Sequence, residues 1–172
     1  MSRPRVVLVG PMGAGKTTVG EILADGLGVS VRDTDADVEA LVGKTVQEVF
    51  VDDGEARFRQ LEKAAVAAAL AEHDGVLSLG GGAVLDPDTR ALLRGQDVVF
   101  LRVGLADAVK RVGLGAGRPL LLGNVRAQVK KLLDERAPIY AQVATLVVDT
   151  DGRTPREIAD EIRAVLDGGR QP

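Results

Sequence analysis

The segment Gly10–Thr17 has the residue types and the spacing of a loop that binds phosphate groups, with the sequence G-P-M-G-A-G-K-T. In such a loop the glycines let backbone N–H groups curve around phosphate oxygens, and the N-terminus of the following helix favours an anion. Lys16 can then reach the β- and γ-phosphates, and the Thr17 hydroxyl can bind Mg²⁺. The pattern predicts a nucleoside-triphosphate site, with contacts from Gly13, Ala14, Gly15, Lys16, Thr17 and Thr18.

Two carboxylates follow the next apolar run of the chain. Asp33 and Asp35 come directly after Val29–Arg32 and are two residues apart. On an extended segment such side chains point the same way, so we expect both at the sheet edge where the phosphate loop also lies. One can join the Mg²⁺ shell while the other faces an acceptor hydroxyl. A helix N-cap and turn is the alternative interpretation, which the neighbouring phosphate loop makes less favoured.

Arginines further along the chain predict an anionic acceptor. Arg59 lies four residues after Glu55 and three before Glu62, so the three side chains share one helix face. Arg136 precedes Ala137-Pro138, where we expect a helix to end near the loop edge of the sheet. Guanidinium groups bind carboxylates and phosphates through paired hydrogen bonds. Two such arginines facing one pocket indicate a small anionic substrate.

The elements that must position these residues alternate along the chain. β-branched runs typical of buried parallel strands occur at Val6–Val9, Val29–Arg32, Val76–Leu79, Val98–Arg102 and Ala144–Val148. Helical periodicity lies between them, with start signals at Thr45–Glu48, Asp86-Pro87 and Thr154–Glu157 and end signals at Gly28, Gly95 and Gly168-Gly169. The only histidine, His73, is expected at a solvated helix end. Repeated strand–helix units predict a three-layer α/β fold, in one domain over residues 1–172.

Two further glycine clusters have different interpretations. Gly80–Gly82 follows the third predicted strand, at the edge where open α/β sheets bind ligands, and can be a close backbone contact to substrate or a tight turn. Gly113–Gly117 resembles a dinucleotide motif, but Arg118 stands where the third glycine is required and a helical stretch precedes it. We therefore reject a dinucleotide site there.

Composition and missing motifs exclude several classes of protein. The chain has 172 residues, a net charge of −3, one Tyr, three Phe, no Trp and no Cys. An acidic chain with so few aromatic residues is unlike a nucleic-acid-binding domain, and the lack of Cys excludes disulfides and thiolate sites. No apolar run approaches the roughly 18 residues of a membrane span. We expect a cytoplasmic monomer with no membrane or nucleic-acid partner. A GTPase base-reading motif, Asn-Lys-x-Asp, is also missing, which favours phosphoryl transfer over a switch.

Six segments together resemble the shikimate kinase family, and its actinobacterial members most closely. They are G-P-M-G-A-G-K-T-T-V-G (10–20), D-T-D (33–35), D-G-E-A-R-F-R (53–59), L-G-G-G-A-V (79–84), G-R-P-L-L (117–121) and R-A-P-I-Y (136–140). The resemblance implies a P-loop kinase fold with a five-stranded parallel sheet, helices on both faces, an acceptor-binding region near residues 33–62 and a mobile lid near residues 113–123. It also implies transfer of the ATP γ-phosphoryl group to the 3-hydroxyl of shikimate, in chorismate and aromatic amino-acid biosynthesis.

The resemblance implies roles for individual residues. Asp35 corresponds to the acidic group at the shikimate hydroxyls, which is proposed as the base, and it shares the catalytic role with Lys16 and Arg118, the lid arginine. Thr17 corresponds to the direct Mg²⁺ ligand, and Asp33 to a residue of its water shell. Shikimate contacts are implied for Arg59, Arg136, Gly81, Gly82, Phe50, Phe58 and Glu62. Adenine is implied to lie between Pro155 and either Arg111 or Lys110.

Two other functions stay open from the residues. Another small-molecule P-loop kinase, acting on gluconate or a nucleoside monophosphate, would share the phosphate loop. A nucleotide base would need aromatic or amide side chains near Arg59, and the sequence has few there. A nucleotide-binding switch protein would bind ATP or GTP whatever small polyol is present.

Overall fold

Five strands form one parallel sheet in the computed structural model, which describes residues 3–114 and 125–168. The strands are β1 (Val6–Val9), β2 (Val31–Asp33), β3 (Val76–Ser78), β4 (Val98–Arg102) and β5 (Leu146–Asp149). Their order across the sheet is β2-β3-β1-β4-β5, so β1 is central and the phosphate loop that follows it opens at the middle of one edge.

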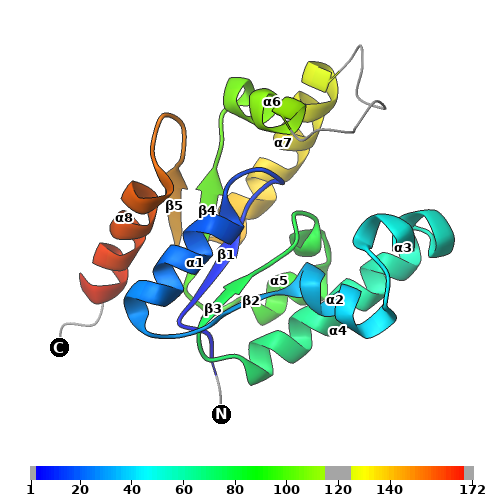
Figure 1. Cartoon of the computed structure of the whole chain (residues 1–172), viewed down its shortest axis with the longest axis horizontal. Coiled ribbons are helices and arrows are strands. Elements are labelled where there is room, and N and C mark those ends of the chain that lie inside the picture. The colour runs from blue at the N-terminus through cyan, green and yellow to red at the C-terminus, as the bar shows by residue number, and fades with distance from the viewer. Residues whose placement is uncertain (1–2, 115–124, 169–172) are drawn as a thin grey trace.

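Helices lie on both faces of this sheet (Figure 1). Their bounds are α1 (Lys16–Leu27), α2 (Thr34–Val42), α3 (Val46–Asp53), α4 (Glu55–Glu72), η1 (Ala83–Leu85), α5 (Pro87–Leu92), α6 (Leu105–Leu114), α7 (Val125–Val143) and α8 (Pro155–Gly168). The predicted three-layer α/β fold is confirmed. Within the described ranges, no helix combines the length and the apolar character that a membrane crossing requires.

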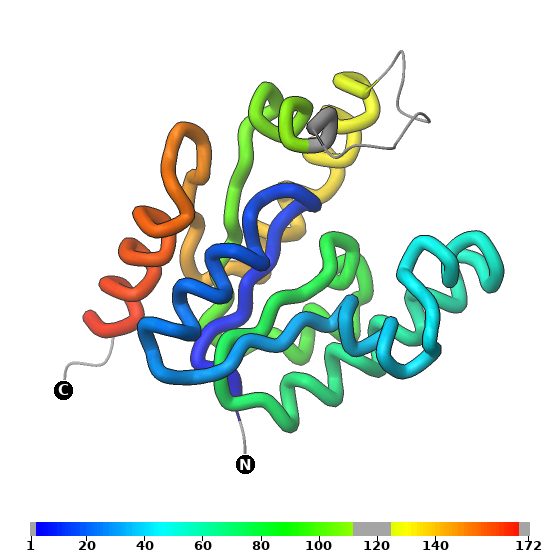
Figure 2. The backbone as a smooth tube through the Cα atoms, viewed as in Figure 1, coloured from blue at the N-terminus to red at the C-terminus, as the bar shows by residue number. Residues whose placement is uncertain are grey.

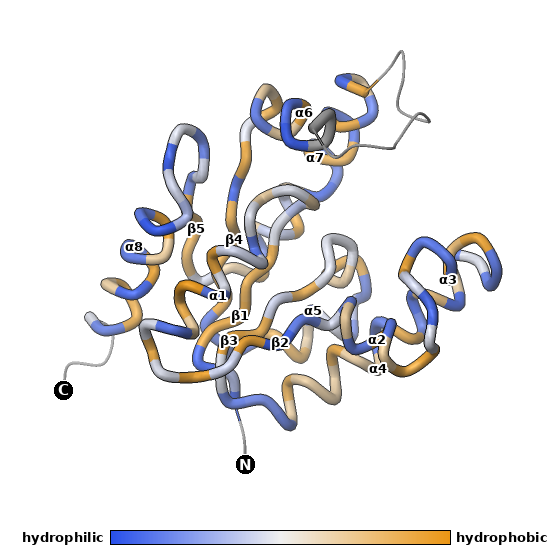
Figure 3. Tube along the Cα trace, viewed as in Figure 1, coloured by the Kyte–Doolittle hydropathy of each residue, from blue (hydrophilic) through white to orange (hydrophobic). Residues whose placement is uncertain are grey.

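Side chains of β1 alternate between two apolar cores, because successive residues of a strand point to opposite faces. Val6 and Leu8 pack with residues of α1 and α8, whereas Val7 and Val9 pack with residues of α4, η1 and α7. All four are at most 1% exposed, which is typical of a central parallel strand covered on both sides. Figure 3 shows the apolar residues along the strands.

The register of the strands brings three functional segments to one edge. Leu8 of β1 and Asp33 of β2 both pair with Ser78 of β3. The phosphate loop after β1, the acidic segment after β2 and the glycines after β3 therefore leave the sheet side by side. Ligands of open α/β sheets bind at this carboxyl edge.

A small lobe beside the sheet consists of α2, α3 and the first half of α4 (Figure 2). Its own apolar core contains Val38, Val49, Phe58 and Leu61. The predicted capping box at Thr45 is present, because its hydroxyl accepts from the Glu48 N–H at 3.1 Å and the Glu48 carboxylate accepts from the Thr45 N–H at 3.4 Å. The lobe coincides with the expected acceptor-binding region and has Phe58 in its core.

Three local predictions are wrong. Arg136 does not lie at a helix end, because α7 continues through Pro138 to Val143. The helix that begins at Pro87 ends at Leu92, and Gly95, with φ of 81°, belongs to the following turn. His73 caps α4 but is buried rather than solvated, since its Nε2 lies 3.2 Å from the Ser30 carbonyl and 3.0 Å from that of Val76.

Candidate active site

The phosphate loop has the backbone that its glycines predict. Gly10, Gly13 and Gly15 have φ of 151°, 82° and 93°, a region that other residues avoid. A Cβ at Gly10 would also lie only 2.7 Å from the Leu101 carbonyl oxygen. Gly15 is the N-cap of α1 and has no capping side chain, so the first N–H groups of the helix are free to bind an anion.

Lys16 lies at the start of α1 with its ammonium group turned back over the loop. Its Nζ donates to the carbonyl oxygens of Gly10 at 2.7 Å and Pro11 at 3.0 Å. Burial lowers the pKa of Lys16 to about 8, although Asp33 and Asp35 act in the opposite direction. The position suits a cation that neutralises phosphate oxygens.

We expected the acidic segment after β2 to be extended, and this expectation is wrong, because α2 begins at Thr34. The Asp33 Oδ1 atom caps this helix and accepts from the N–H groups of Asp35 at 2.8 Å and Ala36 at 3.4 Å. The N-cap interpretation is therefore correct for Asp33. Both Asp33 and Asp35 line the same cavity as Lys16.

Asp35 is a half-buried carboxyl group with two other carboxyl groups, Asp33 and Glu62, near it. Its Oδ1 atom is buried and has no hydrogen-bond partner within the part of the chain that the structure describes. Burial, Asp33 and Glu62 raise the pKa of Asp35 to about 6, and the charge of Lys16 lowers it only in part. A hydrogen bond donated by a ligand hydroxyl would stabilise the ionised form of such a buried carboxyl group.

Arg59 is held from two sides on α4. Its Nη1 donates to the Glu62 carboxylate at 2.7 Å, and Glu55 lies 3.6 Å from its Nε. Glu62 is only 3% exposed, and burial raises its pKa although Arg59 acts in the opposite direction. The Arg59 guanidinium also lies 5.4 Å from the centroid of the Phe58 ring, which packs on Phe50 at 4.7 Å. This arrangement fixes the direction of the guanidinium.

The glycine loop, Gly80–Gly82, lies against these charged groups. A Cβ at Gly80 would lie 2.5 Å from Asp35 Oδ1 and 2.9 Å from Glu62 Oε2, and one at Gly82 would overlap the Arg59 guanidinium. Only at Gly81 is there ordinary space, with Arg136 Nη1 at 3.7 Å. The glycines therefore allow close approach and are not merely turn residues.

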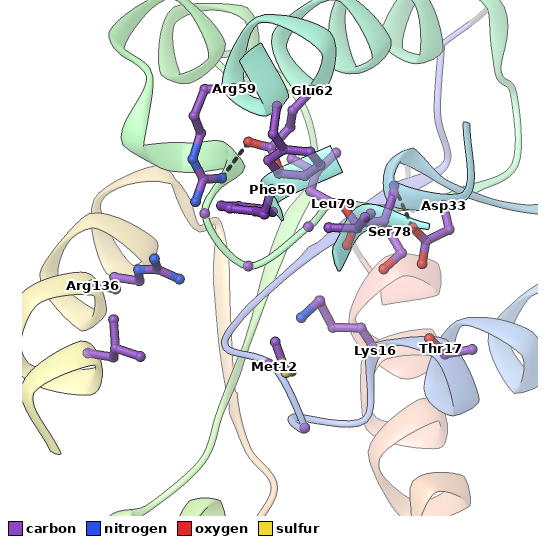
Figure 4. Close-up of a pocket in the computed structure, with 18 of the residues that line it drawn as sticks. Met12, Lys16, Thr17, Asp33, Phe50, Arg59, Glu62, Ser78, Leu79 and Arg136 are labelled. Atoms are coloured by element: carbon purple, nitrogen blue, oxygen red, sulfur yellow. Dashed lines mark hydrogen bonds and ion pairs between the residues drawn. The ribbon is translucent and has the colours of Figure 1, made fainter. Parts of the chain in front are cut away.

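One cavity of about 560 Å³ collects most of the predicted site residues (Figure 4). Lys16, Thr17 and Asp33 lie at one end, and Arg59 and Arg136 lie at the other. Its lining also includes the predicted residues Gly13, Gly15, Thr18, Asp35, Phe50, Phe58, Glu62, Gly81 and Gly82.

The remaining predicted residues do not line this cavity. Ala14 is buried in the core beneath the loop. Arg111 lies outside the cavity but donates to the Gly13 carbonyl at 2.8 Å, whereas Lys110 is exposed. Pro155 begins α8 and is exposed. Arg118 and most of the expected lid lie outside the described residues.

Sequence reasoning missed several residues of the cavity and its support. Met12, Val46, Ser78 and Leu132 line it, and Ser78 also has a buried hydroxyl with no hydrogen-bond partner among the described residues. Tyr140 is a buried support whose hydroxyl donates to the Gly81 carbonyl. Met12 and Tyr140 lie in segments that carry the resemblance, but their residue types do not indicate these contacts. In the sequence, Val46, Ser78 and Leu132 are not distinguished from core residues.

The oxygen groups at the phosphate end fit a magnesium ion bound together with a nucleotide. Thr17 and Ser78 supply hydroxyl groups, and Asp33 supplies a carboxylate. The Ser78 hydroxyl has no hydrogen-bond partner among the described residues, so its oxygen is available as a ligand of the kind that Mg²⁺ prefers. No cluster of three or more His, Cys, Asp or Glu residues able to hold a metal occurs within residues 3–114 and 125–168. Magnesium sites of this class need few protein ligands, because phosphates and water complete the shell.

Comparisons with known proteins agree with this geometry. The family model described as shikimate kinase matches residues 12–167. A shikimate kinase of Salinispora arenicola is 63% identical, covering 95% of this chain and 98% of the relative, and one of Streptomyces coelicolor is 58% identical, covering 97% and 96%. The solved shikimate kinase from Acinetobacter baumannii in complex with shikimate is 32% identical with a TM-score of 0.91, covering 100% of this chain and 97% of that one. The chain therefore belongs to the shikimate kinase family of ATP-dependent kinases.

Proposed function

We propose that the protein transfers the γ-phosphoryl group of ATP to the 3-hydroxyl of shikimate, giving shikimate 3-phosphate and ADP. One observation carries the proposal: a single cavity has a phosphate loop at one end and two arginines at the other. A cavity with these two ends suits a small acceptor that has a carboxylate opposite its reacting hydroxyl. The family of the chain and the shikimate bound in its Acinetobacter relative support this acceptor.

Arg59 and Arg136 bind the acceptor carboxylate. A guanidinium offers two parallel donors to a carboxylate, and Arg59 is already oriented by Glu62. The backbone of Gly81 and Gly82 lies beside both arginines and forms the floor on which the ring rests. Phe50 and Phe58 form an apolar wall, so the ring is fixed before transfer.

Asp35 orients the attacking hydroxyl and accepts its proton. Its charge is influenced both by Lys16 at the phosphate end and by Glu62 beside Arg59, which supports a position between donor and acceptor. Phosphoryl transfer needs little basicity from this group, because most of the catalysis is positioning and charge neutralisation. The ionised form is the active one.

The phosphate loop and Lys16 bind the β- and γ-phosphates and offset the charge that develops on their oxygens. Thr17 and Asp33 would hold a magnesium ion, directly and through water, which supplies further neutralisation when bound. Arg111, in contact with Gly13, and Pro155 are proposed to lie on either side of adenine. Arg118 is proposed to reach the transferred group from a lid over residues 113–123.

The proposal extends to the state of the protein in the cell. We expect one domain over residues 1–172, acting as a monomer in the cytoplasm. The largest exposed apolar side chains, including Leu41, Val51 and Val165, lie on different helices, which supports the monomer. Light scattering after size-exclusion chromatography measures the mass in solution, and a mass twice the 18.0 kDa chain would contradict it.

ADP release from Mg·ATP, measured with and without shikimate, tests the proposed reaction. Strong stimulation by shikimate is expected, with at least about a hundredfold loss in Asp35→Asn, because a neutral amide cannot take up the proton of the attacking hydroxyl. Gluconate and AMP serve as alternative acceptors. If either of them stimulates ADP release in place of shikimate, the protein is a kinase but shikimate is not its acceptor. Nucleotide binding with no stimulation by any of the three would favour the switch protein.

A further inference from the structure

The side chain of Tyr140 connects α7 to the glycine loop, 59 residues earlier in the chain. Its hydroxyl donates a hydrogen bond to the Gly81 carbonyl, and its ring packs on Phe100 with the centroids 5.0 Å apart. Tyr140 is 1% exposed, and burial raises the pKa of its hydroxyl. The hydroxyl therefore remains a donor over the whole pH range in which the protein works.

Arg136 lies one helical turn before Tyr140, so the two side chains share a face of α7. Both reach the same glycine: the hydroxyl meets the Gly81 carbonyl, and Arg136 Nη1 lies 3.7 Å from the place of a Cβ on Gly81. The position of the arginine over the cavity thus depends on how α7 is held at Gly81.

Pro138 lies between these two residues and removes one backbone hydrogen bond from the helix, because proline has no N–H. The helix alone therefore holds the direction of Arg136 less firmly than an unbroken one. A side-chain bond two residues further on compensates for this at the point where the helix passes the glycine loop.

The glycine loop is held from its other side as well. The Gly80 N–H donates to the Thr34 hydroxyl at 3.3 Å, and Thr34 precedes Asp35 in α2. Two side-chain bonds therefore tie the loop to α2 beside Asp35 and to α7 beside Arg136. The glycine loop therefore sets the separation between Asp35, at the acceptor hydroxyl, and Arg136, at the acceptor carboxylate.

We propose that Tyr140 is a positioning residue, whose hydroxyl fixes Arg136 over the acceptor end of the cavity by binding the Gly81 carbonyl. The inference rests on the proposed function, since Arg136 is taken to bind the acceptor carboxylate. Tyr140 itself does not line the cavity and contacts the substrate only through Gly81 and Arg136.

Tyr140→Phe removes the hydroxyl and keeps the ring on Phe100. We expect the KM for shikimate to rise about tenfold, the equivalent of about 1.4 kcal/mol, with the KM for ATP changed less than about twofold. Thr145→Val is the matched control, because the Thr145 hydroxyl bonds the backbone of Val98 at 2.9 Å, at the opposite edge of the sheet. Both variants lose a side-chain bond to the backbone, and only Tyr140→Phe should change the KM for shikimate.

Tyr140 is the only tyrosine, so growth on 3-fluorotyrosine labels this position alone and gives a readout that does not need a variant. Shikimate should shift the ¹⁹F resonance of the wild-type protein, and Arg136→Ala should abolish the shift. An unchanged KM for shikimate in Tyr140→Phe, or a ¹⁹F resonance indifferent to shikimate while wild-type activity depends on it, overturns the inference. Wild-type activity that ignores shikimate contradicts the proposed function instead.

Discussion

The Arg59 guanidinium occupies the space that a Cβ on Gly82 would need. Gly82 has a φ of −102°, which residues other than glycine adopt, so backbone strain does not account for glycine here. A side chain is excluded because Glu62 holds Arg59 against the loop. Gly82 thus leaves room for Arg59 at the acceptor end of the cavity, and Tyr140 positions Arg136 there.

Gly82→Ala should weaken acceptor binding while leaving the fold intact. The new methyl group displaces the guanidinium end of the Arg59 side chain and no backbone, so we expect the KM for shikimate to rise about tenfold and the melting temperature to change by less than about 3 °C. Steady-state kinetics in both substrates and a thermal melt measure the two effects. Gly168→Ala is the control, since no atom of the described residues lies within 4 Å of its Cβ position. Equal kinetics in the two variants would show that the place of Arg59 does not matter.

Activity should depend on pH through Asp35. The pKa of this carboxyl group is raised to about 6, mainly by burial and by Asp33, and its ionised form accepts the hydroxyl proton. At saturating ATP, kcat/KM for shikimate should therefore be constant between about pH 7 and pH 8 and fall about tenfold for each pH unit below 6. Glu39→Gln removes a weaker raising influence and should move the inflection slightly to lower pH. An inflection near the ordinary value of 3.8 in the wild-type protein would contradict the assignment.

The same carboxyl group should destabilise the fold at neutral pH. Its pKa is higher in the folded state than the ordinary 3.8, so the ionised form is disfavoured by folding. The penalty is absent below pH 3.8, grows up to about pH 6 and is constant above it. Asp35→Asn should therefore raise the free energy of unfolding by on the order of 2 kcal/mol at pH 7.5 and by little at pH 4. Denaturant titrations at the two pH values test this, and a gain of equal size at both would assign it to packing instead.

Local signals allowed much of this site to be predicted from the sequence. The glycines of the phosphate loop need positive φ, and β-branched runs between helical stretches define the parallel strands, so both follow from short segments. The expectation that the phosphate loop and the acidic segment leave the sheet at one edge is met, since Leu8 and Asp33 both pair with Ser78. These are the parts where local preference and fold agree.

Contacts between distant segments could not be predicted in this way. The Tyr140 bond to Gly81 joins residues 59 apart, and His73 is buried because Ser30, 43 residues away, offers it a carbonyl. Pro138 normally ends a helix, and we placed Arg136 at a helix end for that reason. Packing of Ile139 and Tyr140 against the sheet core outweighs the lost backbone bond, so α7 continues.

Nucleotide binding should take up protons at alkaline pH through Lys16. Burial lowers the pKa of its ammonium group to about 8, and the charge of bound phosphates favours the protonated form. At pH 8 the uptake through Lys16 should be about half a proton for each nucleotide bound, and this contribution should vanish near pH 6.5, where Lys16 is already protonated. Calorimetric titrations of Mg·ADP in buffers of different ionisation enthalpy measure it directly.

Lys16→Met removes the titrating group and should abolish the uptake at pH 8, even where weaker nucleotide binding persists. Lys63→Met is the matched control, because Lys63 is an exposed lysine whose pKa is raised by Asp88 and Asp86 and which lies outside the cavity. An uptake that survives in Lys16→Met would assign the proton to another group. Affinity for Mg·ADP should also decrease as the pH rises through 8 in the wild-type protein, because the free enzyme then loses the charge that the phosphates require.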